Sequence, residues 1–321
     1  MFTFILRRVL YSIPVLIITS FLIFWAVTVS GDPLTTVMQI PRVSQQTIDS
    51  IIERNHLLDP FLVQYWEWVK DMFTNGFGTT LLSDAPIAPD IRRVLGNTMQ
   101  LIIAAEILAV VLAAIIGVVS AVRQYSLFDY IATTFSFLGF STPTFFLALL
   151  LQILFTNLYL STDVRIVYTS GLSSAGADNF SIDRLQHLAL PVFTLAVLSI
   201  AQFSRYVRAS MLEVVNSDYV RTAKAKGVKQ RKVVMKHALR NAMIPFVTAI
   251  ALDFGTLFGG AIVTETIFGI DGMGRYLVSH LNTRDVYPVM AWLMVTSVIV
   301  IIFNLVADVI YGYLDPRIRY D

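Results

Sequence analysis

The sequence predicts an all-α polytopic membrane protein with six transmembrane helices and both termini in the cytoplasm. Hydrophobic residues make up 56% of the 321 residues and charged residues only 14%, which is too apolar for an ordinary soluble domain. Several apolar runs are long enough to cross a hydrocarbon core of roughly 30 Å. The net charge of +2 gives no indication of nucleic-acid binding, and the absence of cysteine excludes disulfides and cysteine-ligated metal sites.

Residues 1–30 form the N-terminus and the first predicted span. Arg7 and Arg8 precede an apolar run over residues 9–29. A cleaved signal peptide also has a basic start, but its apolar region is usually only ~7–15 residues long. The length of this run therefore favours a transmembrane helix.

Residues 31–97 are mixed polar sequence and are predicted to form a helical extracytoplasmic segment. Apolar residues recur there at helical spacing on both sides of Asp59–Pro60, which indicates two short amphipathic helices separated by a break. Two interpretations fit the aromatic residues of the second helix. They belong to an aromatic belt at the membrane surface, or they pack inside a small layer outside the membrane. These residues are Tyr65, Trp66 and Trp68.

Residues 98–321 form the predicted membrane core, with five further spans. These are expected over residues 99–122, 127–160, 187–204, 244–266 and 289–311. The third region is too long for one upright helix and contains Pro143, so we expect a kink or break there. Pro191 suits the first turn of the fourth span, which is expected to start near His187.

The distribution of basic residues sets the orientation. Fifteen of the 24 Lys and Arg residues lie in the termini and in the loops on the same side as the termini, and nine lie in the opposite set of loops. Because basic loops stay in the cytoplasm, both termini are predicted to be cytoplasmic. Ten of the fifteen are in one loop, residues 205–243.

This basic loop contains a predicted short helix. Ser217 or Asp218 can cap its start, and Gly227 can close it in the left-handed conformation. A second helical stretch is expected over residues 230–241. One interpretation is an orientation signal that lies on anionic membrane lipid. The other is docking into a protein partner, which a face carrying Tyr219, Val220 and Ala223 favours.

The segment DYVRTAKAKGVKQRKVVMKHALRNAMIP resembles the cytoplasmic signature loop of ABC-transporter permeases of the oligopeptide/dipeptide/nickel family, in particular the B-type peptide permease subunit. RRVLYSIPVL, LDPFLVQYWEWV, TETIFGIDGMGRYLVSHLNTRDVYPV and NLVADVIYGYLDPRIRY also match, so the resemblance covers essentially the whole chain. The general signature opens with Glu-Ala-Ala, where this chain has Arg221, Thr222 and Ala223 before Gly227. The glutamate is therefore absent.

The resemblance implies a permease subunit of a peptide importer in the bacterial inner membrane, working by alternating access. Its partners would be a second homologous permease, two cytoplasmic ATPase subunits and an extracytoplasmic peptide-binding protein. The basic loop would supply the coupling helix that contacts an ATPase subunit. The positions carried over to that role are Asp218, Tyr219, Arg221, Thr222, Ala223, Lys224 and Gly227.

The chain is not expected to be an enzyme or to hold a cofactor. It has no G-x-x-x-x-G-K-[ST] phosphate loop, so ATP and Mg are expected in partner subunits. The four histidines form no ligand cluster in sequence, so no metal site is expected. Some members of the family that the chain resembles nevertheless transport nickel. Nickel or another small solute stays an alternative cargo. An ion-coupled secondary transporter is the alternative from another class, and only the region around Pro143 suggests its broken helices.

Polar and small residues in the fifth span are candidates for the translocation path. Asp253, Thr256, Gly260 and Thr264 share one face at helical spacing, while Gly255 and Gly259 form a GxxxG pair for helix packing on another. The alternative role for Asp253 is a buried hydrogen bond to a partner helix. Three further intramembrane acids have two possible roles each. Glu106 lines the path or packs against another helix, and Glu265 lines the path or faces water at the membrane interface. Asp308, four residues after Asn304, lines the path or makes a structural hydrogen bond.

Overall fold

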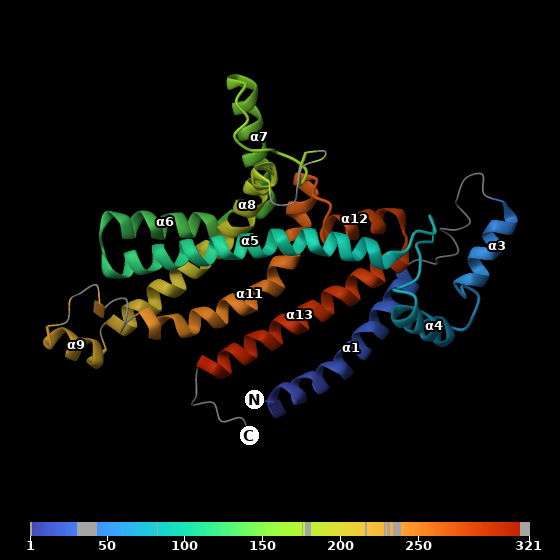
Figure 1. Cartoon of the computed structure of the whole chain (residues 1–321), viewed down its shortest axis with the longest axis horizontal. Helices are drawn as coiled ribbons and strands as arrows, with labels where there is room; N and C mark the ends of the chain where they lie inside the picture. Colours follow the sequence, from blue (N-terminus) through green and yellow to red (C-terminus); the bar gives the residue numbers. More distant parts are fainter. Residues whose placement is uncertain are drawn as a thin grey trace. The chain divides into compact units, whose positions relative to one another are not determined.

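The computed structural model describes residues 2–30, 44–81, 83–174, 176, 181–215, 217–227, 229, 232–233 and 239–314 (Figure 1). Regular structure within these ranges is helical, apart from an isolated bridge between Thr79 and Pro86. The chain folds into two compact units. The N-terminal unit contains Phe2–Thr98 and Asp271–Ile302, and the core unit contains Met99–Ile270 and the residues from Phe303 onward.

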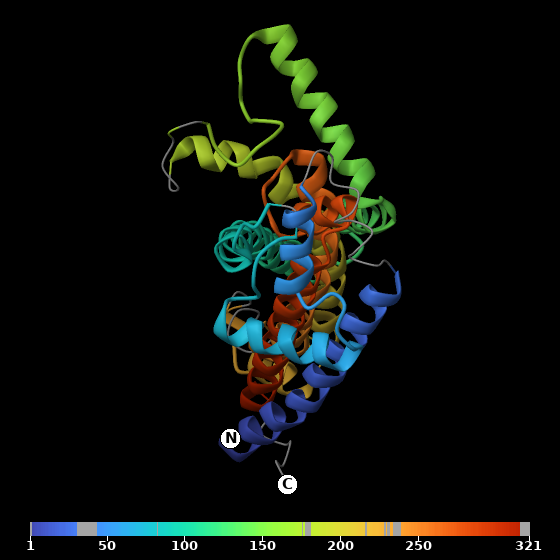
Figure 2. The ribbon, with the colours of Figure 1, turned by 90° about the vertical axis from the view of Figure 1, so that its right-hand side faces the viewer.

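Within the described residues, the N-terminal unit contains six helices or parts of helices. These are α1 (Phe2–Ser30), α3 (Gln45–Arg54), α4 (Phe61–Thr74), the start of α5 (Ile87–Val122), α12 (Met273–Thr283) and the start of α13 (Val286–Leu314). Helix α4 lies across α1 (Figure 2). The predicted first span and the two predicted amphipathic helices are therefore present.

The aromatic residues of α4 divide between the two interpretations that the sequence allows. Trp68 is 3% exposed and packs with Phe24 and two methionines of α13, Met290 and Met294. Trp66 is 65% exposed and takes no part in this cluster. One face of α4 therefore packs on residues of two predicted spans, α1 and α13, while Trp66 lies on its opposite, exposed face. Both interpretations of the aromatic residues stay predictions.

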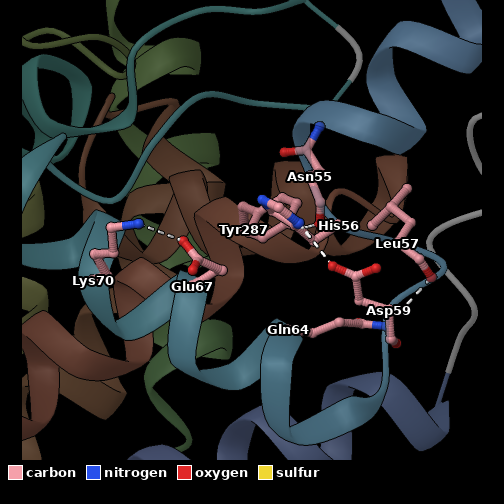
Figure 3. A network of polar contacts seen from close by, with 8 residues as sticks. All are labelled: Asn55, His56, Leu57, Asp59, Gln64, Glu67, Lys70 and Tyr287. Carbon is pink, nitrogen blue, oxygen red and sulfur yellow. Dashed lines mark hydrogen bonds and ion pairs between the residues drawn. The ribbon is translucent and has the colours of Figure 1, made fainter.

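The turn between α3 and α4 is held by polar contacts (Figure 3). Gln64 Nε2 donates to the carbonyl oxygens of Leu57 and Asp59 at 3.2 and 2.8 Å. His56 Nδ1 lies 2.8 Å from Asp59 Oδ2, and the Tyr287 hydroxyl donates to the Asn55 carbonyl at 3.1 Å. The predicted break at Asp59–Pro60 is confirmed, since α3 ends before it and α4 starts directly after it.

The core unit is organised around α8. Its helices are the rest of α5, α6 (Leu127–Ser141), α7 (Thr144–Thr162), α8 (Ile182–Val215), α9 (Asp218–Ala225), α11 (Leu239–Phe268) and the end of α13. Helix α8 contacts α6, α7, α9 and α11. The predicted break at Pro143 is confirmed, because α6 ends at Ser141 and Pro143 occupies the N-cap of α7 with extended backbone.

Helix α8 extends beyond the predicted fourth span at both ends. It begins at Ile182 because the Ser181 hydroxyl accepts the N–H of Arg184 and caps the helix there. Pro191 is consequently inside the helix, and its expected position in the first turn is wrong. At the other end α8 continues to Val215, so the first part of the predicted basic loop is helical. Its residues there are mostly good helix formers.

Five helices among the described residues are long and apolar enough to cross a membrane. They are α1 over Leu6–Val29, α5, α7, α8 and α13 over Val286–Ile310. The predicted third span is divided between α6, with 15 residues, and α7, with 19. Helix α11 is a single helix of 30 residues that includes the predicted fifth span. Helix α5 starts at Ile87, inside the predicted extracytoplasmic segment.

Candidate coupling helix and intramembrane acid pair

Helix α9 follows α8 after a short turn (Figure 1). The carbonyl oxygen of Ser217 accepts the N–H groups of Val220 and Arg221, both at 3.1 Å, and the Ser217 hydroxyl donates to the Val214 carbonyl at 2.6 Å. Gly227 has φ +74°, the left-handed conformation that the sequence predicts for the end of this helix. The predicted short helix is confirmed. Most of the predicted second stretch, 230–241, lies outside the described residues.

The two sides of α9 differ in exposure. Val220 is completely buried, so its side of the helix packs within this chain. The Asp218 side chain is fully exposed, the Arg221 side chain is 73% exposed, and Thr222 is also exposed. The side chains of Tyr219, Ala223 and Lys224 lie outside the described part. A partner can therefore reach Asp218, Arg221 and Thr222, whereas the predicted docking face includes Val220, which it cannot reach.

The Asp218 and Arg221 charges are available to a partner. Their ion pair is long, at 3.9 Å, and fully open to solvent. Exposed pairs of this kind contribute about 0–1 kcal/mol to stability. Little would be lost if either side chain turned to an opposite charge on another subunit.

An ion pair that the sequence did not predict fixes the end of α8 that precedes α9. Arg208 on α8 donates two parallel bonds to Asp129 on α6, from Nε at 2.7 Å and from a terminal nitrogen at 2.8 Å. Asp129 is 3% exposed and also accepts the N–H of Tyr125 at 3.0 Å. Ser126 is the N-cap of α6, and its side chain accepts the N–H of Asp129. These bonds tie the end of α8 next to α9 to α6.

A pair of acids lies in the core unit, one on α5, which is long and apolar enough to cross a membrane, and one on α11. Glu106 on α5 is 3% exposed, and neither of its carboxylate oxygens has a hydrogen-bond partner in the described structure. The carboxylate of Asp253 on α11 acts on it electrostatically. Asp253 is half-buried and accepts a 2.6 Å bond from the Ser199 hydroxyl on α8. Three helices therefore contribute to this acid pair.

The other predicted path residues keep their common face because α11 is one uninterrupted helix. Thr264 on this face is completely buried, and the side chains of Thr256 and Gly260 lie outside the described part. In the predicted packing pair, Gly255 is half-buried and Gly259 is also outside the description. The path and packing roles of these residues stay predictions.

The remaining acids differ from one another. Glu265 is completely buried within the chain, which contradicts a water-facing interfacial carboxylate. Asp308 is half-buried and Asn304 exposed, and the structural role of these two stays a prediction. A Cβ on Gly117, eleven residues after Glu106 on α5, would lie 2.6 Å from the Val207 Cβ on α8. Helices α5 and α8 therefore pack closely at Gly117.

Comparisons with known proteins cover nearly the whole chain. A family model described as "Binding-protein-dependent transport system inner membrane component" matches residues 109–320, and one described as "Binding-prot-dependent transport system membrane comp, N-term" matches residues 1–87. The chain is 39% identical over 324 residues to an oligopeptide transport system permease protein of Bacillus subtilis (strain 168), covering 100% of both chains.

Other relatives show similar identity. A dipeptide transport system permease protein of Alkalihalophilus pseudofirmus is 38% identical over 334 residues, and a glutathione transport system permease protein of Salmonella typhi is 36% identical over 321 residues. Both matches cover 100% of each chain. A chain of the inward-facing MetNI methionine ABC transporter has a TM-score of 0.57 at 16% identity, covering 70% of this chain and 96% of that chain. This last likeness shows the fold.

Proposed function

The chain belongs to the family of binding-protein-dependent transport system inner membrane components, and we propose that it is the permease subunit of an ATP-driven importer of peptides. The observation that carries the peptide assignment is full-length similarity, at 36–39% identity, to permeases named for oligopeptides, dipeptides and glutathione. All three cargoes contain peptide bonds. The long apolar helices fit a protein of the inner membrane.

The proposed assembly contains a second, similar permease, two cytoplasmic ATPase subunits and an extracytoplasmic peptide-binding protein. ATP and Mg bind to the ATPase subunits, since this sequence has no phosphate-loop motif. Helix α9 is the contact point for one ATPase subunit. Its exposed face, which carries Asp218, Arg221 and Thr222, supports this role.

The proposed mechanism is alternating access. Closure of the ATPase pair moves α9, α8 moves with it, and the bonds between Arg208 and Asp129 carry the movement to α6. The face of α11 that includes Asp253, Thr256, Gly260 and Thr264 lines the path, while Gly255 and Gly259 pack against another helix. ATP binding and the loaded binding protein shift the populations of inward-open and outward-open states.

The coupling role is tested by reversing the charge of the exposed α9 residues. We expect Asp218→Lys combined with Arg221→Glu to abolish copurification of the ATPase subunits, because each reversed charge would face a like charge in the partner. Arg123→Glu is the matched control, an exposed charge reversal outside α9. Unchanged ATPase association and uptake in the α9 variant would refute the coupling assignment.

The cargo is tested by transport through the complete importer in liposomes. Labelled dipeptides, tripeptides and longer peptides are offered together with nickel as a competitor. We expect ATP-dependent accumulation of peptide that nickel does not inhibit. Accumulation of nickel without peptide transport would contradict the peptide assignment and support the metal alternative.

A further inference from the structure

The acid pair of the core unit has an arrangement that plain packing does not explain. Glu106 is almost completely buried, and both of its carboxylate oxygens are without a hydrogen-bond partner among the described residues. The carboxylate close to it, Asp253, has the same charge sign and is held by the 2.6 Å bond from Ser199. Two acids on different helices are thus brought together.

This arrangement costs free energy. A buried acceptor without a partner costs about 1–3 kcal/mol, and more when it is charged. A second carboxylate in range adds repulsion if both are ionised. Intramembrane acids of this kind typically face a cavity or pathway and mark the position of a cation or proton. A positively charged group with several N–H donors would satisfy the Glu106 oxygens and offset the repulsion.

The need to donate hydrogen bonds to two carboxylates limits which positively charged group can bind here. A primary ammonium carries three N–H donors and no acceptor, so it can bridge two carboxylates. A divalent metal ion would need more ligands, and within the described residues no group of three or more His, Asp or Glu side chains is placed to supply them. Peptides carry a primary ammonium at the N-terminus and on each lysine side chain.

We propose that Glu106 and Asp253 form a transient binding site for a primary ammonium group of a peptide in transit. The half-buried Asp253 is the member that the ammonium reaches first, and Glu106 receives it when the helices separate. Ser199 orients the Asp253 carboxylate. This inference rests on the proposed peptide transport, to which it adds a recognition step within the membrane.

The test uses the complete importer in liposomes with matched peptides. The two peptides of a pair differ at one position, which is lysine in one and norleucine in the other. Each peptide is made with a free and with an acetylated N-terminus, and all are chosen to bind the isolated binding protein with equal affinity. We expect the wild type to transport peptides with an ammonium group about tenfold faster than the acetylated norleucine peptide, as one charged hydrogen bond allows. The acetylated lysine peptide carries only the side-chain ammonium, and the norleucine peptide with a free N-terminus carries only the N-terminal ammonium. Comparing the two shows which ammonium group the importer prefers.

Two variants probe the site and one serves as control. Glu106→Gln and Asp253→Asn keep the side-chain shape and remove a charge. In each variant the ratio of the two transport rates should fall from about ten towards one, and this ratio is measured within the variant, independently of its overall rate. Asp163→Asn changes an exposed acid at the end of α7 and should keep the preference. Assembly of each variant is checked by copurification of the ATPase subunits.

The outcomes separate this inference from the proposed function. A wild-type importer that transports peptides with no preference for the ammonium group overturns the inference alone, as does a preference that survives in both variants. Equal loss of transport for all peptides in both assembled variants also overturns it, because that result indicates a structural role. An importer that transports no peptide overturns the proposed function and this inference with it.

Discussion

Breaking the ion pair between Arg208 and Asp129 should destabilise the core unit strongly. The pair has two bonds at 2.7 and 2.8 Å, and Asp129 is 3% exposed. Removing one partner of a buried pair costs about 3–5 kcal/mol, because the other charge is left unpaired. The Arg208 side chain is 28% exposed and keeps some contact with solvent. We therefore expect each single variant to lose about 2–3 kcal/mol of unfolding free energy.

A double-mutant cycle measures the interaction itself. Asp129→Asn, Arg208→Gln and the double variant are unfolded with SDS in mixed micelles, and the free energies of unfolding are compared. The double variant should lose less than the sum of the single variants, by about 2 kcal/mol. The matched control is Arg54–Asp84, whose side chains are 43% and 61% exposed at a separation of 2.8 Å. Its coupling should be clearly weaker, because solvent screens both charges.

Additive effects would refute this reasoning. If the double variant loses the sum of the two single losses to within about 0.5 kcal/mol, the bonds contribute nothing specific. The same result would remove the proposed connection from α9 to α6. Equal coupling in both pairs would show that burial of Asp129 is not the source of the strength.

Three further variants, the first with a matched control, test other features. Gly117→Ala places a Cβ 2.6 Å from a side chain of α8 and should cost about 1–3 kcal/mol of unfolding free energy, whereas Gly96→Ala, with no atom within 4 Å, should be neutral or stabilising. Gly227→Ala, at φ +74°, should destabilise α9 by about 1 kcal/mol, measured as faster amide exchange there. The Thr79 hydroxyl, aided by a nearby arginine, lowers the pKa of Asp84, so the stability that this group contributes is present above its unfolded pKa and is lost as pH falls through the folded pKa. Asp84→Asn should make acid unfolding less dependent on pH over that interval, and an unchanged dependence would contradict this.

Local signals predicted the features whose cause lies within a few residues. Pro143 removes a backbone donor and breaks the third apolar region, and Gly227 adopts a conformation that other residues avoid. Asp59–Pro60 separates α3 from α4 for a related reason. Backbone preference alone fixes such positions, so one sequence is sufficient to find them.

Contacts between distant residues could not be predicted in this way. Arg208 and Asp129 are 79 positions apart, and their pairing depends on which helices pack together. The same holds for Glu106 and Asp253. The sequence marks each of them as an intramembrane acid, but it does not indicate that the two lie close together. The end of α8 was placed too early because Arg205 closes an apolar run, although a helix can continue once it leaves the hydrocarbon layer.

The length of α8 sets the size of the movement that it can transmit. Pro191 removes one backbone bond near the beginning of the helix, and the 24 residues from there to Val215 continue without another proline over about 36 Å. A change of about 10° in direction at Pro191 would swing the far end through about 6 Å. If the proposed coupling acts through α8, a small change of direction at Pro191 would displace α9 by several ångströms.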